Sequence, residues 1–122
     1  MELKRVVVTG LGALTPIGNT IQEYWDGLTN GVSGADYITL FDAEKFKTRF
    51  ACEVKNFNPE DFMDRKEARK IDRFSQLAIV SSDQAIADAN LNTDEAINKD
   101  RVGVIWASGI GGIGTFYEEM KG

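Results

Sequence analysis

Histidine is absent from this chain of 122 residues. Histidine is the usual general base of Ser/His/Asp and Cys/His catalytic centres, and it supplies the metal ligands of HExxH zinc sites. These residues therefore cannot form a histidine-based triad, zinc site or proton shuttle by themselves. We expect no metal site in the chain.

Cysteine is scarce, since Cys52 is the sole example. No intrachain disulfide can form, and a reducing, cytoplasmic setting is expected. Phe50, Cys52 and Val54 alternate with Ala51 and Glu53, which predicts a strand over residues 48–55 with Cys52 pointing into the core.

Positive charge is in deficit, with 14 Lys and Arg against 19 Asp and Glu and a net charge of -5. Because an acidic protein repels polyanions, we expect neither nucleic acid nor a membrane as a partner. Long apolar runs are also missing: Thr9, Gly10 and Pro16 interrupt the N-terminal one, so no targeting or membrane-spanning segment is visible. The remaining composition, 43% hydrophobic and 27% charged, is typical of a globular domain.

The apolar periodicity predicts an α/β arrangement. Two apolar runs without alternation, 4–9 and 102–109, predict strands covered on both faces, as in a parallel or mixed sheet. Helices are predicted over 20–30 (begun by a Thr20/Glu23 capping box and ended by Asn30-Gly31), 59–63, 65–89 and 115–121, with a polar linker over 92–101.

Gly10-Leu11-Gly12 follows the first predicted strand, as in dinucleotide-binding proteins. However, Thr15 stands where the third glycine of that motif should be, and the next helix begins only at Thr20. A pyrophosphate would therefore lack the helix N-terminus that normally binds it. We predict a tight turn with positive φ instead, and a Rossmann-type oxidoreductase is the weakest alternative.

A second glycine cluster, Ser108 to Gly112, follows the other apolar run. Glycines let a backbone approach a ligand closely or flex, and Ile110 is the one bulky side chain among them. The spacing alone does not distinguish a ligand site from a strand-to-helix turn.

Five cations occupy the start of the predicted long helix. On a continuous helix they project within an arc of about 140°, opposite the apolar stripe. Cations near a helix N-terminus and like charges at i, i+4 both cost stability. The cluster is therefore either a solvated face or a docking surface for a compact acidic partner. Its members are Arg65, Lys66, Arg69, Lys70 and Arg73.

Five segments in order strongly resemble the N-terminal part of the type II, elongating β-ketoacyl-acyl-carrier-protein synthases, the condensing enzymes of bacterial fatty acid synthesis. They are RVVVTGLGALTPIGNT, FDAEKF, DRKEARKIDRF, QAIADANL and RVGVIWASGIGG. The resemblance implies a thiolase-like α/β fold, an αβαβα sandwich with a mixed sheet. Residues 1–122 would be the N-terminal segment of its first half, incomplete and without a domain boundary. It also implies a homodimer that needs no cofactor, because substrates arrive on the phosphopantetheine arm of acyl carrier protein.

The resemblance assigns binding roles to this chain but no catalytic residue. Lys66, Arg69 and Lys70 match the family's carrier-docking cations, with Arg65 and Arg73 flanking them, and Ile110 matches the gate of the acyl pocket, between Gly109 and Gly111. The family's nucleophile lies in an Ala-Cys-Ser context that Cys52 does not match, and its two histidines are missing here. The 122 residues alone should therefore be inactive. They should also be poorly folded, because the two apolar strands and the long helix expect packing partners that these residues do not supply. Alternatives are a non-catalytic carrier-binding module and a chain-length-factor-like partner.

Overall fold

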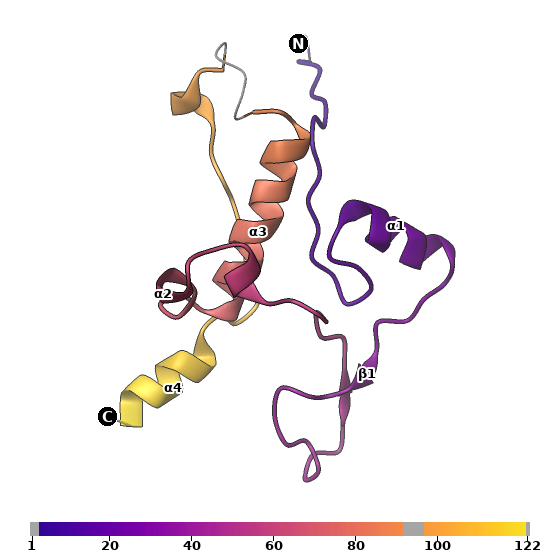
Figure 1. Ribbon diagram of the computed structural model, residues 1–122, viewed down its shortest axis with the longest axis vertical. Coiled ribbons are helices and arrows are strands. Elements are labelled where there is room, and N and C mark those ends of the chain that lie inside the picture. The colour runs from indigo at the N-terminus through magenta and orange to yellow at the C-terminus, as the bar shows by residue number, and fades with distance from the viewer. Residues whose placement is uncertain (1–2, 92–96, 122) are drawn as a thin grey trace. The chain divides into compact units, whose positions relative to one another are not determined.

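The computed structural model describes residues 3–91 and 97–121 (Figure 1). Its helices are α1 (Ile21–Thr29), α2 (Arg65–Ala68), α3 (Arg73–Asp88) and α4 (Ile113–Lys121), its 3-10 helices are η1 (Pro59–Asp61) and η2 (Lys99–Arg101), and its strands are β1 (Asp36–Tyr37) and β2 (Phe50–Ala51). They belong to two compact units: Met1–Gly12 with Pro59–Gly122, and Ala13–Asn58. The predicted linker 92–101 lies partly outside the described residues, and its described part contains η2.

In the unit Ala13–Asn58, α1 forms where the sequence predicts it. The Thr20 hydroxyl accepts a hydrogen bond from the amide of Glu23 at 3.2 Å, while the Glu23 carboxylate accepts one from the amide of Asn19 at 2.7 Å. Asn30 caps the C-terminus, and Gly31 follows with φ of +66°. Both predicted ends of the helix are confirmed, because each has side-chain or backbone groups that satisfy its open hydrogen bonds.

The same unit contains an antiparallel ribbon in which Asp36 pairs with Ala51 and Tyr37 with Phe50. The predicted strand over 48–55 is therefore reduced to two residues. The prediction that Cys52 points into a core is wrong, since Cys52 is exposed. A ribbon of two strands gains a buried face only where another layer packs on it, and alternation along the sequence does not supply that layer.

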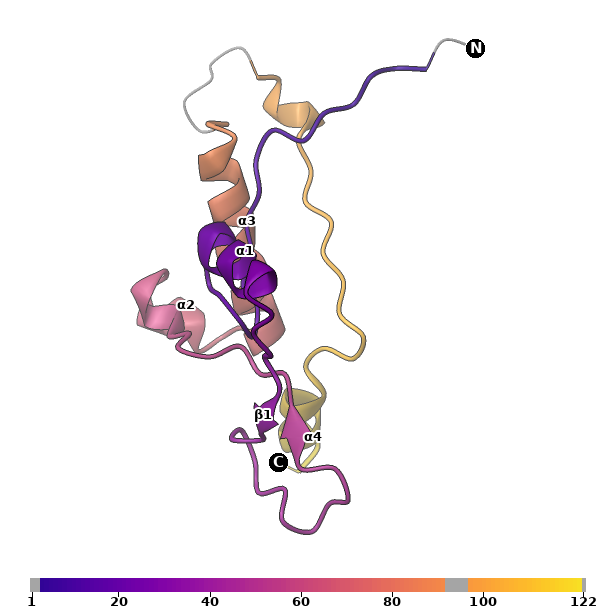
Figure 2. The same cartoon turned by 90° about the vertical axis from the view of Figure 1, so that its right-hand side faces the viewer.

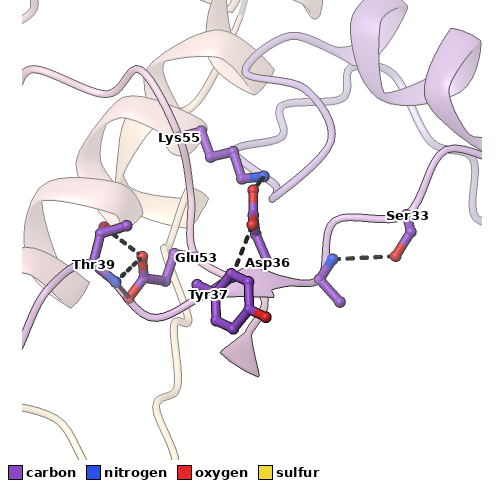
Figure 3. Close-up of polar contacts among 7 residues, drawn as sticks. Ser33, Asp36, Tyr37, Thr39, Glu53 and Lys55 are labelled. Carbon is purple, nitrogen blue, oxygen red and sulfur yellow. Dashed lines mark hydrogen bonds and ion pairs between the residues drawn. The ribbon is translucent and has the colours of Figure 1, made fainter. Parts of the chain in front are cut away.

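Side chains hold the ends of this ribbon together (Figure 3). The Lys55 ammonium lies 2.9 Å from the Asp36 carboxylate. The Glu53 carboxylate accepts hydrogen bonds from the Thr39 amide at 3.1 Å and from the Thr39 hydroxyl at 2.7 Å. Polar contacts therefore fix the ribbon where apolar packing is slight.

In the other unit, residues 10–12 lie against α3. The amide of Leu11 donates to the Asp88 carboxylate at 2.9 Å. A Cβ atom at position 10 would lie 2.6 Å from the amide nitrogen of Ala89, and one at position 12 would lie 2.9 Å from that of Ala85. Among the described residues only Gly31 and Gly112 are glycines with positive φ, so the positive φ predicted for Gly10 and Gly12 is wrong. These glycines admit a close approach between two backbones instead.

The two predicted buried strands do not form within the described residues, whose one sheet is the ribbon of β1 and β2. Residues 102–107 run as a trace without a strand arrow in Figure 2, and Ile105 is 99% exposed. Residues 4–9 are likewise exposed, with Val6 at 87%. An apolar run becomes a strand only with hydrogen-bonded neighbours on its edges, which the described residues do not provide.

The predicted long helix over 65–89 is interrupted between α2 and α3. Asp72 adopts extended backbone angles (φ -66°, ψ 156°) as the N-cap of α3. The Gln76 side-chain amide donates to the carbonyl oxygen of Ala68 at 2.8 Å and to that of Ile71 at 3.3 Å. The break is thus stabilised by a side chain that satisfies the carbonyls left open at it. The short turn predicted over 59–63 is confirmed as η1.

The buried part of this unit is small and lies on α2 and α3. Ala68 and Ser81 are buried, and Val80 is 2% exposed. Ser81 also borders the backbone of Gly12, so α3 is the element on which this unit is assembled.

Candidate functional site

The predicted docking cations lie over α2 and the turn that follows it. The Asp64 carboxylate caps α2 by accepting from the amide of Lys66 at 2.7 Å. Arg69 forms the C-cap, and the amide of Lys70 donates to the carbonyl oxygen of Glu67 at 2.9 Å. The one-turn helix α2 therefore presents Arg65 and Lys66, and the turn after it presents Arg69 and Lys70.

The five cations differ in their surroundings. Lys66, Arg69 and Lys70 are exposed, and none of them belongs to an ion pair between described residues. Arg65 lies 3.3 Å from the Glu60 carboxylate of η1, and Arg73, the first residue of α3, is half-buried. The three exposed cations outside these ion pairs are the three residues assigned by the resemblance, whereas Arg65, although exposed, pairs with Glu60 and Arg73 is half-buried.

The arc of cations predicted on one continuous helix is wrong, because α2 ends at Ala68 and α3 begins at Arg73. The angular positions expected from one continuous helix apply only to Arg65 and Lys66, which both lie on α2. The break also removes Arg69 and Arg73 from the i, i+4 relation of one helix, which lessens the like-charge cost expected there.

Beside these cations lies a hollow that the sequence did not predict, with a volume of about 400 Å³. Its lining is mostly apolar, and Ile79 of α3, which is 43% exposed, contributes to it. Lys70 lies on the lining, so the hollow and a docking cation share one residue. The lining residues are Met63, Glu67, Lys70, Ile71 and Ile79.

The glycine-rich segment that carries Ile110 leads into α4. Ile110 is 76% exposed. A Cβ atom at position 109 or 114 would meet nothing within 4 Å, whereas one at position 111 would lie 2.7 Å from the Phe74 ring. The segment is therefore open at Gly109 and tightly packed at Gly111.

Asp72 and Thr115 are functional candidates that the sequence analysis missed. The Thr115 hydroxyl donates to the Asp72 carboxylate, which joins α4 to the N-terminus of α3. The position of Asp72 before a helix is typical of an N-cap, and nothing in the spacing indicates that its side chain bonds to a residue 43 positions away.

A hollow of about 370 Å³ in the unit Ala13–Asn58 contains no predicted site residue. It lies beside the capped N-terminus of α1, and Glu23 and Lys55 are its charged lining residues. Both carboxylate and ammonium are engaged in the contacts described above, with Asn19 and Asp36. This hollow is explained by the packing of α1 and the ribbon.

No group of three His, Cys, Asp or Glu side chains suited to a metal ion occurs among the described residues. Within the same residues, no helix is both long and apolar enough to cross a bilayer.

Solved structures define the class of fold. The chain aligns with a β-ketoacyl synthase from Burkholderia phymatum with a TM-score of 0.72 at 30% identity, over 98% of this chain and 30% of that one. It also aligns with the ishigamide ketosynthase/chain length factor with a TM-score of 0.65 at 35% identity, over 80% of this chain and 23% of that one. The chain therefore has part of a ketosynthase fold, which is thiolase-like, as the resemblance implies.

Residues 3–121 match the family model described as the N-terminal domain of β-ketoacyl synthases, and the chain belongs to this family. It is 54% identical over 113 residues to a 3-oxoacyl-[acyl-carrier-protein] synthase 2 of Synechocystis sp., covering 93% of this chain and 27% of the relative. A synthase of the same description from Staphylococcus aureus is 51% identical over 113 residues, with the same coverage. The chain thus spans about a quarter of the length of these curated relatives.

Proposed function

We propose that this chain forms the N-terminal part of a 3-oxoacyl-[acyl-carrier-protein] synthase of fatty acid biosynthesis, called the complete synthase below. The observation that carries the proposal is the family match over residues 3–121, with 54% identity to a curated synthase. The enzyme would be an acyltransferase. It would accept an acyl chain as a thioester on a cysteine and then condense it with malonyl-carrier protein, forming a carbon–carbon bond as carbon dioxide leaves.

That reaction needs a thiolate nucleophile and donors for the developing enolate and oxyanion. This chain contains no histidine, and Cys52 lies exposed beside β2 in a context unlike that of the family's nucleophile. The residues that perform the chemistry therefore lie outside it. Its own contribution is binding, and no cofactor is required because the carrier's phosphopantetheine arm delivers the substrates.

Lys66, Arg69 and Lys70 would dock acyl carrier protein, an acidic partner. Their exposure and lack of ion pairs with other described residues support this role, since unpaired surface cations steer an oppositely charged protein. The apolar hollow beside Lys70 would receive an apolar side chain of the carrier. Arg65 and Arg73 would contribute less, because Arg65 already pairs with Glu60 and Arg73 is half-buried.

Ile110 would gate the acyl pocket. The exposure of Ile110 and the open space around Gly109 support this role, because a gate must have room to change position. We also propose that the complete synthase is a cytoplasmic homodimer without nucleic-acid or membrane partners, in agreement with the single cysteine and the net charge of -5 of these 122 residues.

The test is an assay of the complete synthase with acyl- and malonyl-carrier protein, following carbon dioxide release and the 3-oxoacyl product. The complete synthase should form product, and the 122-residue chain alone should form none. As a second arm, residues 3–121 would replace the homologous segment of the Synechocystis enzyme, and this chimera should also be active. Carrier binding by the complete synthase without product would overturn the proposal in favour of a non-catalytic module.

A chain-length-factor-like partner subunit is a second candidate, favoured by the similarity to the ishigamide ketosynthase/chain length factor. The sequence of the complete synthase distinguishes the two. A cysteine in an Ala-Cys-Ser context followed by two histidines identifies a synthase, whereas their absence identifies a factor. The family match removes the support for an oxidoreductase.

A further inference from the structure

The N-terminus of α3 is joined to the glycine-rich segment by two contacts. The first is the hydrogen bond from the Thr115 hydroxyl to the Asp72 carboxylate. The second is the packing of Gly111 on the Phe74 ring, where a Cβ atom at position 111 would lie 2.7–2.9 Å from three ring carbons. The contacts lie on either side of Gly112, which is therefore held between them.

The Asp72 side chain serves the segment rather than its own helix. Asp72 occupies the N-cap position of α3, where a carboxylate normally accepts from an amide of the first turn. In the described part of the chain its side chain makes no capping hydrogen bond. The carboxylate accepts a hydrogen bond from the Thr115 hydroxyl of α4 instead, and the first turn of α3 lacks the hydrogen bond that a capping side chain normally supplies.

Glycine is required at two positions of the segment for separate reasons. Gly112 has φ of +71°, and a Cβ atom there would lie 2.6 Å from the Asp72 carboxylate. At Gly111 the obstacle is the Phe74 ring, with φ outside the positive region. The backbone directly after Ile110 is thus fixed by α3, while Gly109 directly before it lies in open space.

We propose that Asp72, Phe74 and Thr115 are positioning residues that set where the Ile110 side chain stands and thereby determine which acyl chains the enzyme accepts. This inference rests on the proposed function, in which Ile110 gates the acyl pocket. Asp72 follows Lys70 by two residues and directly precedes Arg73, so one turn of the chain carries the docking cations and supports the gate. Substitutions that disturb the positioning residues should nevertheless change acyl-chain selectivity without changing carrier binding, because different side chains perform the two tasks.

The first test compares Gly111→Ala with Gly114→Ala in the complete synthase. The new methyl group at position 111 meets the Phe74 ring, whereas position 114 has open space around it. We expect Gly111→Ala to lower kcat/KM for dodecanoyl-carrier protein about fivefold more than for hexanoyl-carrier protein, a change equivalent to the loss of one contact. The KM for malonyl-carrier protein should not change, and Gly114→Ala should match the wild type in all three quantities.

The second test compares Thr115→Val with Thr115→Ser, which keeps the hydroxyl. Both changes are at an exposed position, so the protein should fold in each case. Thr115→Val should shift the dodecanoyl-to-hexanoyl ratio in the same direction as Gly111→Ala, and Thr115→Ser should retain the wild-type ratio. Amide hydrogen exchange of residues 109–112 should accelerate in Thr115→Val alone, a readout that does not depend on activity.

The outcomes separate this inference from the proposed function. A wild-type synthase that forms no product contradicts the function itself. An active wild type in which Thr115→Val leaves both the selectivity ratio and the exchange rates unchanged overturns the positioning role. The positioning role is also overturned if Gly111→Ala or Thr115→Val raises the KM for malonyl-carrier protein without changing acyl-chain selectivity. The contacts of Asp72 and Phe74 with the glycine-rich segment would then support carrier docking instead.

Discussion

The backbone of Gly12 lies directly against the carbonyl oxygen of Ser81, with no room for a Cβ atom between them. Because Ser81 is buried within α3, the helix cannot move aside without disturbing the small core around Val80. This contact explains why glycine is needed at position 12, where the spacing from Gly10 resembles that of a phosphate-binding turn.

Gly12→Ala should lower the free energy of unfolding of the complete synthase by about 1–3 kcal/mol, the usual cost of forcing a methyl group into a packed contact. Gly114→Ala is the matched control, since a Cβ atom there would meet nothing within 4 Å and alanine is a better helix former than glycine, so this change in α4 should not lower the free energy of unfolding. Urea denaturation measures both. Equal effects of the two changes would contradict the proposed contact.

Reversing the charge of Lys66 and Arg69 to Glu should raise the KM for malonyl-carrier protein about tenfold or more at low salt while kcat changes little, because rim charges act on encounter and docking. Added salt should raise the wild-type KM and reduce the difference between variant and wild type. Lys45→Glu with Lys47→Glu is the matched control, as both lysines are exposed and lie outside the docking cations. An unchanged KM in the first variant at low salt would remove the docking assignment.

The hydrogen bond from Lys55 lowers the pKa of the Asp36 carboxyl below its ordinary value, with further contributions from the Tyr37 amide and from the charge of Lys55. A carboxyl with a lowered pKa in the folded state stabilises that state above its unfolded pKa. The contribution disappears as the pH falls through the folded pKa. We therefore expect Lys55→Met to raise the Asp36 pKa toward its ordinary value and to destabilise the ribbon at neutral pH but not in strong acid. Carboxyl NMR titration measures the shift, Lys55→Arg should preserve it, and an identical titration in Lys55→Met would refute the pairing.

Thr20→Ala should destabilise the complete synthase by about 1 kcal/mol, because the amide of Glu23 loses its hydrogen-bond acceptor at the start of α1. Thr29→Ala makes the same chemical change in the last turn of the same helix. There the hydroxyl only donates to the carbonyl oxygens of Trp25 and Asp26, and the effect should stay within about 0.5 kcal/mol. Thermal unfolding distinguishes the two, and a cap role is excluded if Thr29→Ala costs as much as Thr20→Ala.

The features that sequence predicted well are those decided within one turn of chain. The Thr20 cap, the stop at Gly31 and the proline-led turn at η1 depend on neighbouring residues, so their spacing in the sequence is sufficient. The break between α2 and α3 depends on Gln76 reaching back eight residues to Ala68, a contact that periodicity does not encode.

Burial and distant pairing account for the errors. The alternation around Cys52 indicates which side chains share a face but not whether anything covers it. Of the site, the exposed cations could be found from composition and family resemblance. The hydrogen bond between Asp72 and Thr115 could not, since it joins residues 43 positions apart. The hollow beside Ile79 could not either, since its lining depends on the break between α2 and α3.

The exposed apolar residues 6–8 and 102–107 have a consequence for handling the 122-residue chain on its own. Extended β-branched segments with open edges are templates for pairing between molecules, which leads to inclusion bodies or fibrils. Each run is preceded by cations that act as gatekeepers against such pairing, Lys4 and Arg5 before Val6 and Arg101 before Val102. Replacing these cations with neutral residues would lower the soluble yield of the isolated chain first, before any change in its helices.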